Sequence, residues 1–172
     1  LLVEEKAETW VNLHDDLFLD KKTGEFIWSS ERTGFRHLEL RDVNGKLVRA
    51  LTSGDWPVDR VVHHDSDRRE VWFLAGRETP LESRLYRVSI EGGELEELTI
   101  EPGLHLVTVS HDGSRFVDQV SSRSAPTRTT LRDRSGKPLG TLDDAASDSR
   151  IQELALNPPE FFSFENRDGV KL

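Results

Sequence analysis

The chain has 172 residues, of which 35% are hydrophobic and 32% are charged, and its formal net charge is −9. This acidic balance argues against nucleic acid or an anionic membrane surface as a partner, because neither polyanion would be attracted. The sequence contains no cysteine, which excludes disulfides and thiolate chemistry within it, and no apolar run long enough for a membrane span. So low an apolar fraction favours thin β layers with solvated loops over one large core.

The first residues predict a β-strand. Residues 1–13 are mixed apolar and polar, with Trp10 near the end, and no hairpin partner precedes them. Asp15 and Asp16 follow at the entry to the next segment. Neighbouring carboxylates at such a position are more typical of turn and cap residues than of a catalytic pair. A turn over residues 20–24 then leads into the first hairpin.

The stretch from Glu25 to Leu51 predicts a meander. Its strands cover residues 26–28, 37–40 and 46–51, and a polar loop over residues 29–34 joins the first two. Asn44-Gly45 between the second and third strands predicts a type I′ turn, in which both central residues have positive φ.

Two further units repeat this plan. The second has strands over residues 61–64, 70–75, 85–90 and 94–98, and the third over 106–109, 115–120, 129–133 and 138–142. The first hairpin turns fall at Gly24, Asp67 and Gly113, a step of about 45 residues, which is the period of four-stranded propeller blades. A generic antiparallel sandwich also has short strands joined by turns, but it need not repeat at a fixed period. The sequence therefore predicts an all-β partial β-propeller of about three four-stranded antiparallel blades.

Three aromatic residues recur at corresponding places in the units. Trp28, Phe73 and Phe116 each lie on the second strand of a unit. We interpret them as core between neighbouring blades and not as a ligand cage, because large aromatic side chains dominate such cores.

The end of the chain predicts a change of domain. Residues 145–156 suggest one or two helical turns with Asp143 or Asp144 as N-cap, and Asn157-Pro158-Pro159 ends them. Residues 160–165 alternate and predict a new strand, followed by a turn at residues 167–169. We place the propeller blades at residues 1–157, and a linker with the first strand of another domain at residues 158–172.

Two clusters have residue types that suggest chemistry. His63 and His64 are adjacent, so on a strand they point to opposite faces and converge poorly on one metal ion. Ser110, His111 and Asp112 include all three types of a catalytic triad, but adjacency in sequence is not triad geometry, and Asp112-Gly113 predicts a turn. We therefore expect no catalytic residue, no metal site and no cofactor here.

One motif carries a family resemblance. Trp28-Ser-Ser-Glu-Arg-Thr-Gly-Phe-Arg-His-Leu38 resembles the signature W-x-S-E-x-x-G-[FY]-R-H-[LI] in the propeller of the dipeptidyl peptidase IV family of prolyl-specific serine peptidases. The flanking residues 9–16 and 51–56 agree with it, and residues 159–164 and 168–172 resemble the join between that propeller and an α/β-hydrolase domain. The signature residues that match are Trp28, Glu31, Gly34, Phe35, Arg36 and His37.

The resemblance implies a role without chemistry. In that family an eight-bladed propeller caps an α/β-hydrolase domain with a Ser-Asp-His triad, which removes dipeptides from N-termini with proline or alanine second. The nucleophile motif G-W-S-Y-G is absent here, and no other Gly-x-Ser-x-Gly occurs. The glutamates that bind the substrate amine belong to an earlier blade. Glu96-Glu97 lies on a predicted outer strand, so we do not assign it that role.

The chain would thus be the C-terminal part of the propeller, ending where the hydrolase domain starts. Its implied partners are the hydrolase domain in cis and, through the parent protein, a peptide substrate; open blade faces also predict self-association. The alternative is a stand-alone propeller-type binding or scaffold module. Arg36 and His37 either brace neighbouring blades or line the pore. The resemblance favours a periplasmic or secreted protein over a cytoplasmic one, and the compartment stays open.

Overall fold

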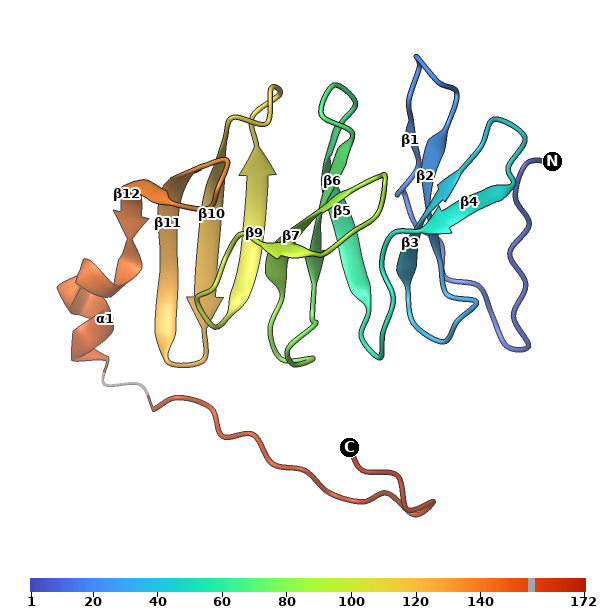
Figure 1. Cartoon of the computed structure of the whole chain (residues 1–172). Helices are drawn as coiled ribbons and strands as arrows, with labels where there is room; N and C mark the ends of the chain where they lie inside the picture. The colour runs from blue at the N-terminus through green and yellow to red at the C-terminus, as the bar shows by residue number, and fades with distance from the viewer. Residues whose placement is uncertain (155–156) are drawn as a thin grey trace.

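The computed structural model describes residues 1–154 and 157–172. Twelve strands form three four-stranded antiparallel sheets that stand side by side in chain order (Figure 1). We call them blades 1, 2 and 3. Blade 1 contains β1 (Phe18–Leu19), β2 (Phe26–Ser30), β3 (His37–Arg41) and β4 (Leu47–Ala50). Blade 2 contains β5 (Val58–Asp65), β6 (Glu70–Ala75), β7 (Arg84–Ser89) and β8 (Glu96–Glu97). Blade 3 contains β9 (Leu104–Val109), β10 (Arg115–Ser122), β11 (Ala125–Asp133) and β12 (Pro138–Asp144).

This architecture confirms the predicted fold class. In each blade the strands pair in sequence order, so each blade is an up-and-down meander. The two-residue strand β1 supplies the fourth strand that the predicted first meander lacked. Among the described residues, no helix combines the length and the hydropathy that crossing a membrane requires.

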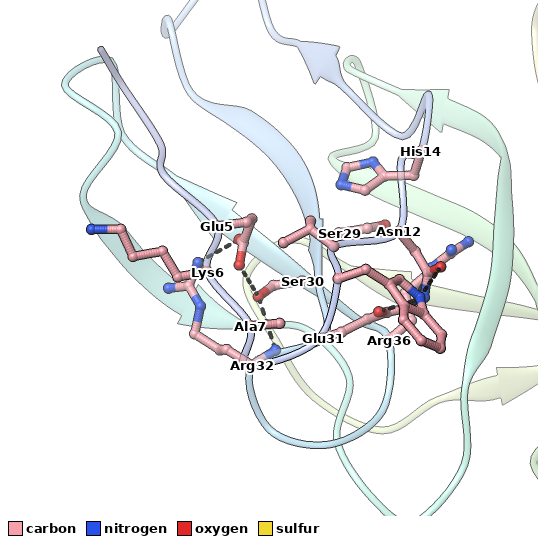
Figure 2. A pocket seen from close by; sticks show the side chains of 12 residues that line it. Glu5, Lys6, Ala7, Asn12, His14, Ser29, Ser30, Glu31, Arg32 and Arg36 are labelled. Carbon is pink, nitrogen blue, oxygen red and sulfur yellow. Dashed lines mark hydrogen bonds and ion pairs between the residues drawn. The ribbon is translucent and has the colours of Figure 1, made fainter.

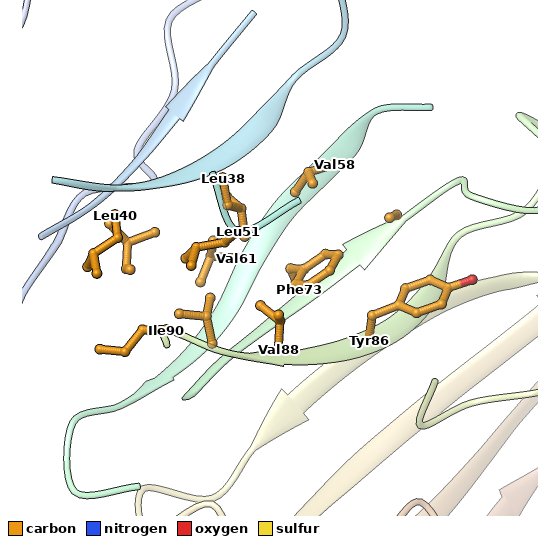
Figure 3. Packing of buried hydrophobic residues seen from close by; sticks show 12 residues of the cluster. Leu38, Leu40, Leu51, Val58, Val61, Phe73, Tyr86, Val88 and Ile90 are labelled. Atoms are coloured by element: carbon orange, nitrogen blue, oxygen red, sulfur yellow. The ribbon is translucent and has the colours of Figure 1, made fainter. Parts of the chain in front are cut away.

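The core lies between the blades. Side chains alternate along each strand, so one face of blade 2 presents Val71, Phe73 and Tyr86 to blade 1 (Figure 3). The opposite face presents Trp72 and Leu74 to blade 3. Because blade 2 is covered on both faces, its strand β6 is a nearly continuous apolar run, as expected of a strand buried on both sides. The residues of blade 1 in the first cluster are Ile27, Leu38, Leu40 and Leu51, and those of blade 3 in the second are Val107 and Phe116.

The aromatic correspondence predicted from sequence is shifted by two residues at Phe116. Trp28 pairs with Glu39, two positions before the end of β3, and Phe73 pairs with Tyr86, three positions before the end of β7. Phe116 instead pairs with Arg132, one position before the end of β11. The residue of blade 3 that corresponds to Trp28 is therefore Asp118. Phe73 and Phe116 are interblade core as predicted, but Trp28 belongs to neither cluster.

The hairpin turn at Asn44-Gly45 is not type I′. Only Gly45 has a positive φ, 83°. The Asp42 carboxylate accepts the N–H groups of Asn44 and Lys46, both at 2.9 Å, and this bonding holds Asn44 outside the left-handed region. The turn at Asp133 has the same bonds and again closes with a glycine, so an aspartate-initiated loop with a terminal glycine is a repeated feature of the blades.

Two predicted strands do not form. The described residues 1–13 have no strand pairing; they lie along the face of blade 1 that is directed away from blade 2 (Figure 1). Side-chain hydrogen bonds to blade 1 hold this segment, from Trp28 and Arg32 to Glu5 and from Asn12 to Glu31. Residues 160–163 are also unpaired. Residues 164–172 instead form a small hairpin, closed by the predicted turn and by hydrogen bonds between Phe164 and Leu172.

The predicted helical turns are present. Asp144 is the N-cap of η1 (Ala145–Ser147), and its carboxylate accepts the N–H of Ala146 at 3.0 Å. The helix α1 (Ser149–Glu153) follows, and Leu156, the predicted end, lies outside the described residues. The tail then passes beneath the lower ends of the blades (Figure 1). The domain boundary at residue 157 stays a prediction.

Candidate functional site

The signature residues occupy the end of β2, the loop that follows and the start of β3. The side chain of Trp28 is on the face of blade 1 that the N-terminal segment covers. Its indole Nε1 donates to Glu5 Oε1 at 2.9 Å, and the ring of His14 packs edge-on against it with 4.7 Å between centroids. Trp28 therefore packs against the N-terminal segment and not in the core between the blades.

The Glu5 carboxylate accepts three hydrogen bonds from this part of blade 1. Besides Trp28, Ser30 Oγ donates to it at 3.3 Å and Arg32 Nη2 at 2.5 Å (Figure 2). Partial burial raises the pKa of Glu5, but the bonds from Trp28 and Arg32 outweigh that effect and leave the pKa below its ordinary value. The site is therefore built for the ionised carboxylate.

Glu31 and Arg36 connect the loop to two different neighbours. The carboxylate of Glu31 accepts both contacts from Asn12 Nδ2, at 3.1 and 2.8 Å, and lies 3.7 Å from Arg36 Nε. Arg36 also donates to the backbone carbonyl of Asp59 in blade 2 at 3.0 Å. This residue therefore links blade 1 to the inner strand of blade 2.

His37 is buried and holds the linker between blades 1 and 2. Its Nε2 lies 2.9 Å from the carbonyl of Gly54, and its Nδ1 lies 3.0 Å from the hydroxyl of Thr52. Because a carbonyl only accepts, Nε2 donates to Gly54, and Nδ1 is hydrogen-bonded to the Thr52 hydroxyl. The same hydroxyl accepts the N–H of Leu38, and in blade 2 Thr99 accepts the N–H of Leu85 in the same way.

Gly34 and Phe35 complete the loop. Gly34 has φ +104°, which favours glycine, and its N–H donates to the carbonyl of Glu31 at 2.9 Å. The side chain of Phe35 is 39% exposed. The structure thus separates the signature: Trp28 and Glu31 contact the N-terminal segment, whereas Arg36 and His37 reach blade 2 and its linker.

A small cavity of about 60 Å³ lies between the N-terminal segment and the loop (Figure 2). Its lining combines the polar residues Asn12, Glu31 and Arg36 with the apolar Trp10 and Val11. A space of this size suits a few water molecules and is far smaller than the pockets that hold small-molecule ligands. A larger groove of about 780 Å³ lies between the tail and blades 2 and 3, and Leu81, Leu104 and Phe161 are among its lining residues.

The clusters that suggested chemistry are part of the blade structure. His63 packs edge-on against Trp72, and His64 lies against Phe18 of blade 1, so the two side chains point to opposite faces as predicted. Ser110 Oγ donates to the Asp112 carboxylate at 2.7 Å inside the predicted turn. Among the residues that the structure describes, no group of three histidine or acidic side chains is placed to hold a metal ion.

The glutamates of the outer strand form ion pairs within blade 2. Glu97 Oε1 is 2.8 Å from Arg84, and Glu96 Oε2 is 2.5 Å from Arg87. Both glutamates thus pair with arginines of β7, and we assign them no role in binding a substrate amine.

Sequence reasoning missed two buried carboxylates. Asp16 accepts the hydroxyl of Ser29 at 2.8 Å and the N–H of Val61 in blade 2 at 2.9 Å, so it joins two blades. Asp118 lies at the position that corresponds to Trp28, between His105 and Arg132. The sequence pattern could have revealed Asp118, because it alternates with Phe116 and Val120 on the core-facing side of a strand. A charge buried at such a position requires hydrogen-bonding or charged partners.

Three successive four-stranded antiparallel blades, packed face to face, define a protein of the β-propeller class. A family model described as "Dipeptidyl peptidase IV (DPP IV) N-terminal region" matches residues 1–127. The chain belongs to this family.

Relatives of known identity agree with this family. Human dipeptidyl peptidase 8 is 28% identical over 214 aligned residues, which include 100% of this chain and 23% of that protein. A probable dipeptidyl peptidase 4 of Emericella nidulans is 28% identical over 157 residues, covering 89% of this chain and 20% of that protein. The chain thus spans less than a quarter of the length of these relatives. The crystal structure of Porphyromonas gingivalis dipeptidyl peptidase 4 superposes with a TM-score of 0.79 at 26% identity, covering 91% of this chain and 22% of that one.

Proposed function

We propose that this chain is a non-catalytic part of the propeller of a dipeptidyl peptidase IV-like serine peptidase. In this proposal it gates and positions peptide N-termini with proline or alanine second, and an α/β-hydrolase domain in cis supplies the triad. Residues 1–157 are propeller blades and residues 158–172 lead into the hydrolase domain. The observation that carries the proposal is the similarity to human dipeptidyl peptidase 8 over the whole of this chain.

Two features of the chain support a role in gating. The sequence has no Gly-x-Ser-x-Gly nucleophile motif, so the bond chemistry would have to come from outside it. The tail runs under one edge of the blades and leaves the groove of about 780 Å³ between itself and blades 2 and 3. Arg123 lies over the ring of Phe161 at 5.7 Å and holds the tail at that edge.

We further propose a bracing role for Arg36 and His37. The bond from Arg36 to the Asp59 carbonyl crosses from blade 1 to blade 2, and both ring nitrogens of His37 are engaged by the linker. Because both ring nitrogens of His37 are used internally, this side chain has little capacity left to bind a substrate in the pore.

The experiment is an intact-mass measurement of the protein that carries this segment, paired with hydrolysis of glycyl-prolyl-p-nitroanilide. The proposal predicts a mass several-fold above the 19.6 kDa of this chain, and turnover that a serine-directed inhibitor abolishes. Substrates with proline or alanine second should be cleaved in preference to the matched glycyl-leucyl compound. A protein of 19.6 kDa without turnover would contradict the proposal and favour the stand-alone binding module.

The 172-residue chain on its own should also self-associate. On β9 the side chains of His105 and Val107 are buried, whereas those of Leu104 and Leu106 are 57% and 50% exposed on the face directed away from blade 2. A sheet face with exposed leucines tends to be covered by a partner. Sedimentation velocity over a concentration series tests this, and a compact monomer that is insensitive to concentration would contradict it.

A further inference from the structure

The N-terminal segment and the linker between blades 2 and 3 hold corresponding positions in the repeat. A Cβ placed on Gly45 in the β3–β4 turn would overlap the backbone carbonyl of Leu2, and one on Gly136 in the β11–β12 turn would overlap that of Leu98. Three residues after each leucine stands a glutamate, Glu5 in one case and Glu101 in the other. Both glutamates bond to the blade that follows them in the chain, although the donors differ.

Three different kinds of donor form hydrogen bonds to the Glu5 carboxylate. Trp28 contributes an indole N–H, Ser30 a hydroxyl and Arg32 a guanidinium, from alternate residues at the end of β2 and in the loop that follows. Figure 2 shows Ser30 and Arg32 beside Glu5. The indole N–H and the guanidinium have only donors, so each needs an acceptor, and the Glu5 carboxylate supplies it. The side chain of Glu5 is 15% exposed and that of Arg32 is 39% exposed, so the ion pair is shielded from solvent on the Glu5 side only.

We propose that Trp28, Ser30 and Arg32 form a carboxylate-binding cradle, that Glu5 is its occupant, and that this contact latches residues 1–14 onto blade 1. The latch gives Trp28, one of the signature residues, a structural role. The segment otherwise has few attachments: Asn12 to Glu31 and the packing of His14 against Trp28. The inference does not depend on the proposed function, since it concerns how the propeller holds its own segment.

The neighbouring charges favour Glu5 over Glu4 as the occupant. Glu4 pairs with Lys6 at 3.2 Å, and both of these side chains are largely exposed. The other charged residues around the cavity are Lys6, His14, Glu31 and Arg36, and Glu31 is already engaged by Asn12. The adjacent Glu4 is therefore a matched control for Glu5.

Trypsin provides the test, because the Lys6–Ala7 bond lies inside the latched segment. Cleavage of a transiently opened segment follows the population of the open form when closing is fast. In the protein that carries this segment, Trp28→Phe and Arg32→Gln should each raise the cleavage rate at Lys6, measured by mass spectrometry, by roughly tenfold. Both changes leave the sequence around the scissile bond untouched.

A double-mutant cycle identifies the occupant. Glu5→Gln should raise the rate by a similar factor after correction with free peptides of residues 1–14, and adding Arg32→Gln should then change it little further. The control Glu4→Gln should leave the rate unchanged and should add independently to Arg32→Gln. A rate within twofold of wild type for Trp28→Phe, Arg32→Gln and Glu5→Gln would overturn the proposal. So would full additivity of Glu5→Gln with Arg32→Gln.

General unfolding is distinguishable from release of the latch. A destabilised variant would be cut at many sites in parallel, whereas release of the latch raises cleavage at Lys6 alone. Trp28→Phe keeps an aromatic ring beside His14 while it removes the N–H donor together with the second ring of the indole, so it gives a second report on the latch if Arg32→Gln perturbs folding.

Discussion

The imidazole of His105 and the carboxylate of Asp118 lie 2.7 Å apart, and both side chains are fully buried in blade 3. Asp118 also accepts from Arg132 Nε at 2.9 Å, and Arg132 reaches Glu101 of the preceding linker at 2.6 Å. The other ring nitrogen of His105 lies 2.9 Å from the carbonyl of Glu101. Both ring nitrogens of His105 therefore face oxygen atoms, and the Asp118 carboxylate lies between the imidazole and the Arg132 guanidinium.

Asp118→Asn should be strongly destabilising. It leaves His105 and Arg132 buried without their shared anion, and breaking a buried ion pair in this way costs about 3–5 kcal/mol. The free energy of unfolding from urea titration checks the loss. Asp148→Asn is the control, because its partner Arg150 is 85% exposed and the pair should contribute little. Equal effects of the two substitutions would contradict the assignment.

Asp16→Ala should weaken the contact between blades 1 and 2. The change leaves the N–H of Val61 and the hydroxyl of Ser29 without their acceptor, at a cost of about 1–3 kcal/mol. The adjacent Asp15→Ala removes an exposed carboxylate and should shift the urea midpoint little. If Asp15→Ala proved as costly as Asp16→Ala, the interblade bond would not be the cause.

Gly136→Ala should cost more than Gly34→Ala. Both glycines have positive φ, 85° and 104°, so alanine is strained at either position by roughly 1 kcal/mol. At Gly136 the new methyl group would also overlap the Leu98 carbonyl of blade 2, whereas no heavy atom lies within 4 Å of the corresponding position at Gly34. Thermal unfolding of the two variants measures the difference, and similar melting temperatures would show that the turn is not held against blade 2.

Stability should fall as the pH drops below about 6.5. Burial lowers the pKa values of His63 and His64 in the folded chain, so below about pH 6.5 the unfolded state binds more protons than the folded state. Proton binding therefore favours unfolding, and keeping the two histidines neutral contributes to the stability of the fold. This contribution is fully present above the ordinary histidine pKa and is lost as the pH falls. Urea titrations between pH 5 and 8 check it: the double variant His63→Gln/His64→Gln should depend less on pH than wild type. An unchanged slope would contradict the prediction.

Prediction from the sequence succeeded where local patterns repeat. Alternation of apolar residues and glycine-containing turns located the strands of each blade, and the step between equivalent turns identified the propeller. It failed for the described residues 1–13 and 160–163, whose composition suits a strand but which pair with no strand in the structure. Strand formation requires a hydrogen-bonding partner, and composition does not show whether one is free.

The sequence by itself determined the blade repeat, the family signature and the absence of a nucleophile motif, because each of these is a matter of residue order and spacing. Only the tertiary structure decided which charged residues are buried together. Glu5 meets Arg32 and Asp16 meets Val61 across long stretches of chain, and Asp118 meets two partners on neighbouring strands. A carboxylate is stable in a core only where such distant donors converge, and that convergence is a property of how the blades pack.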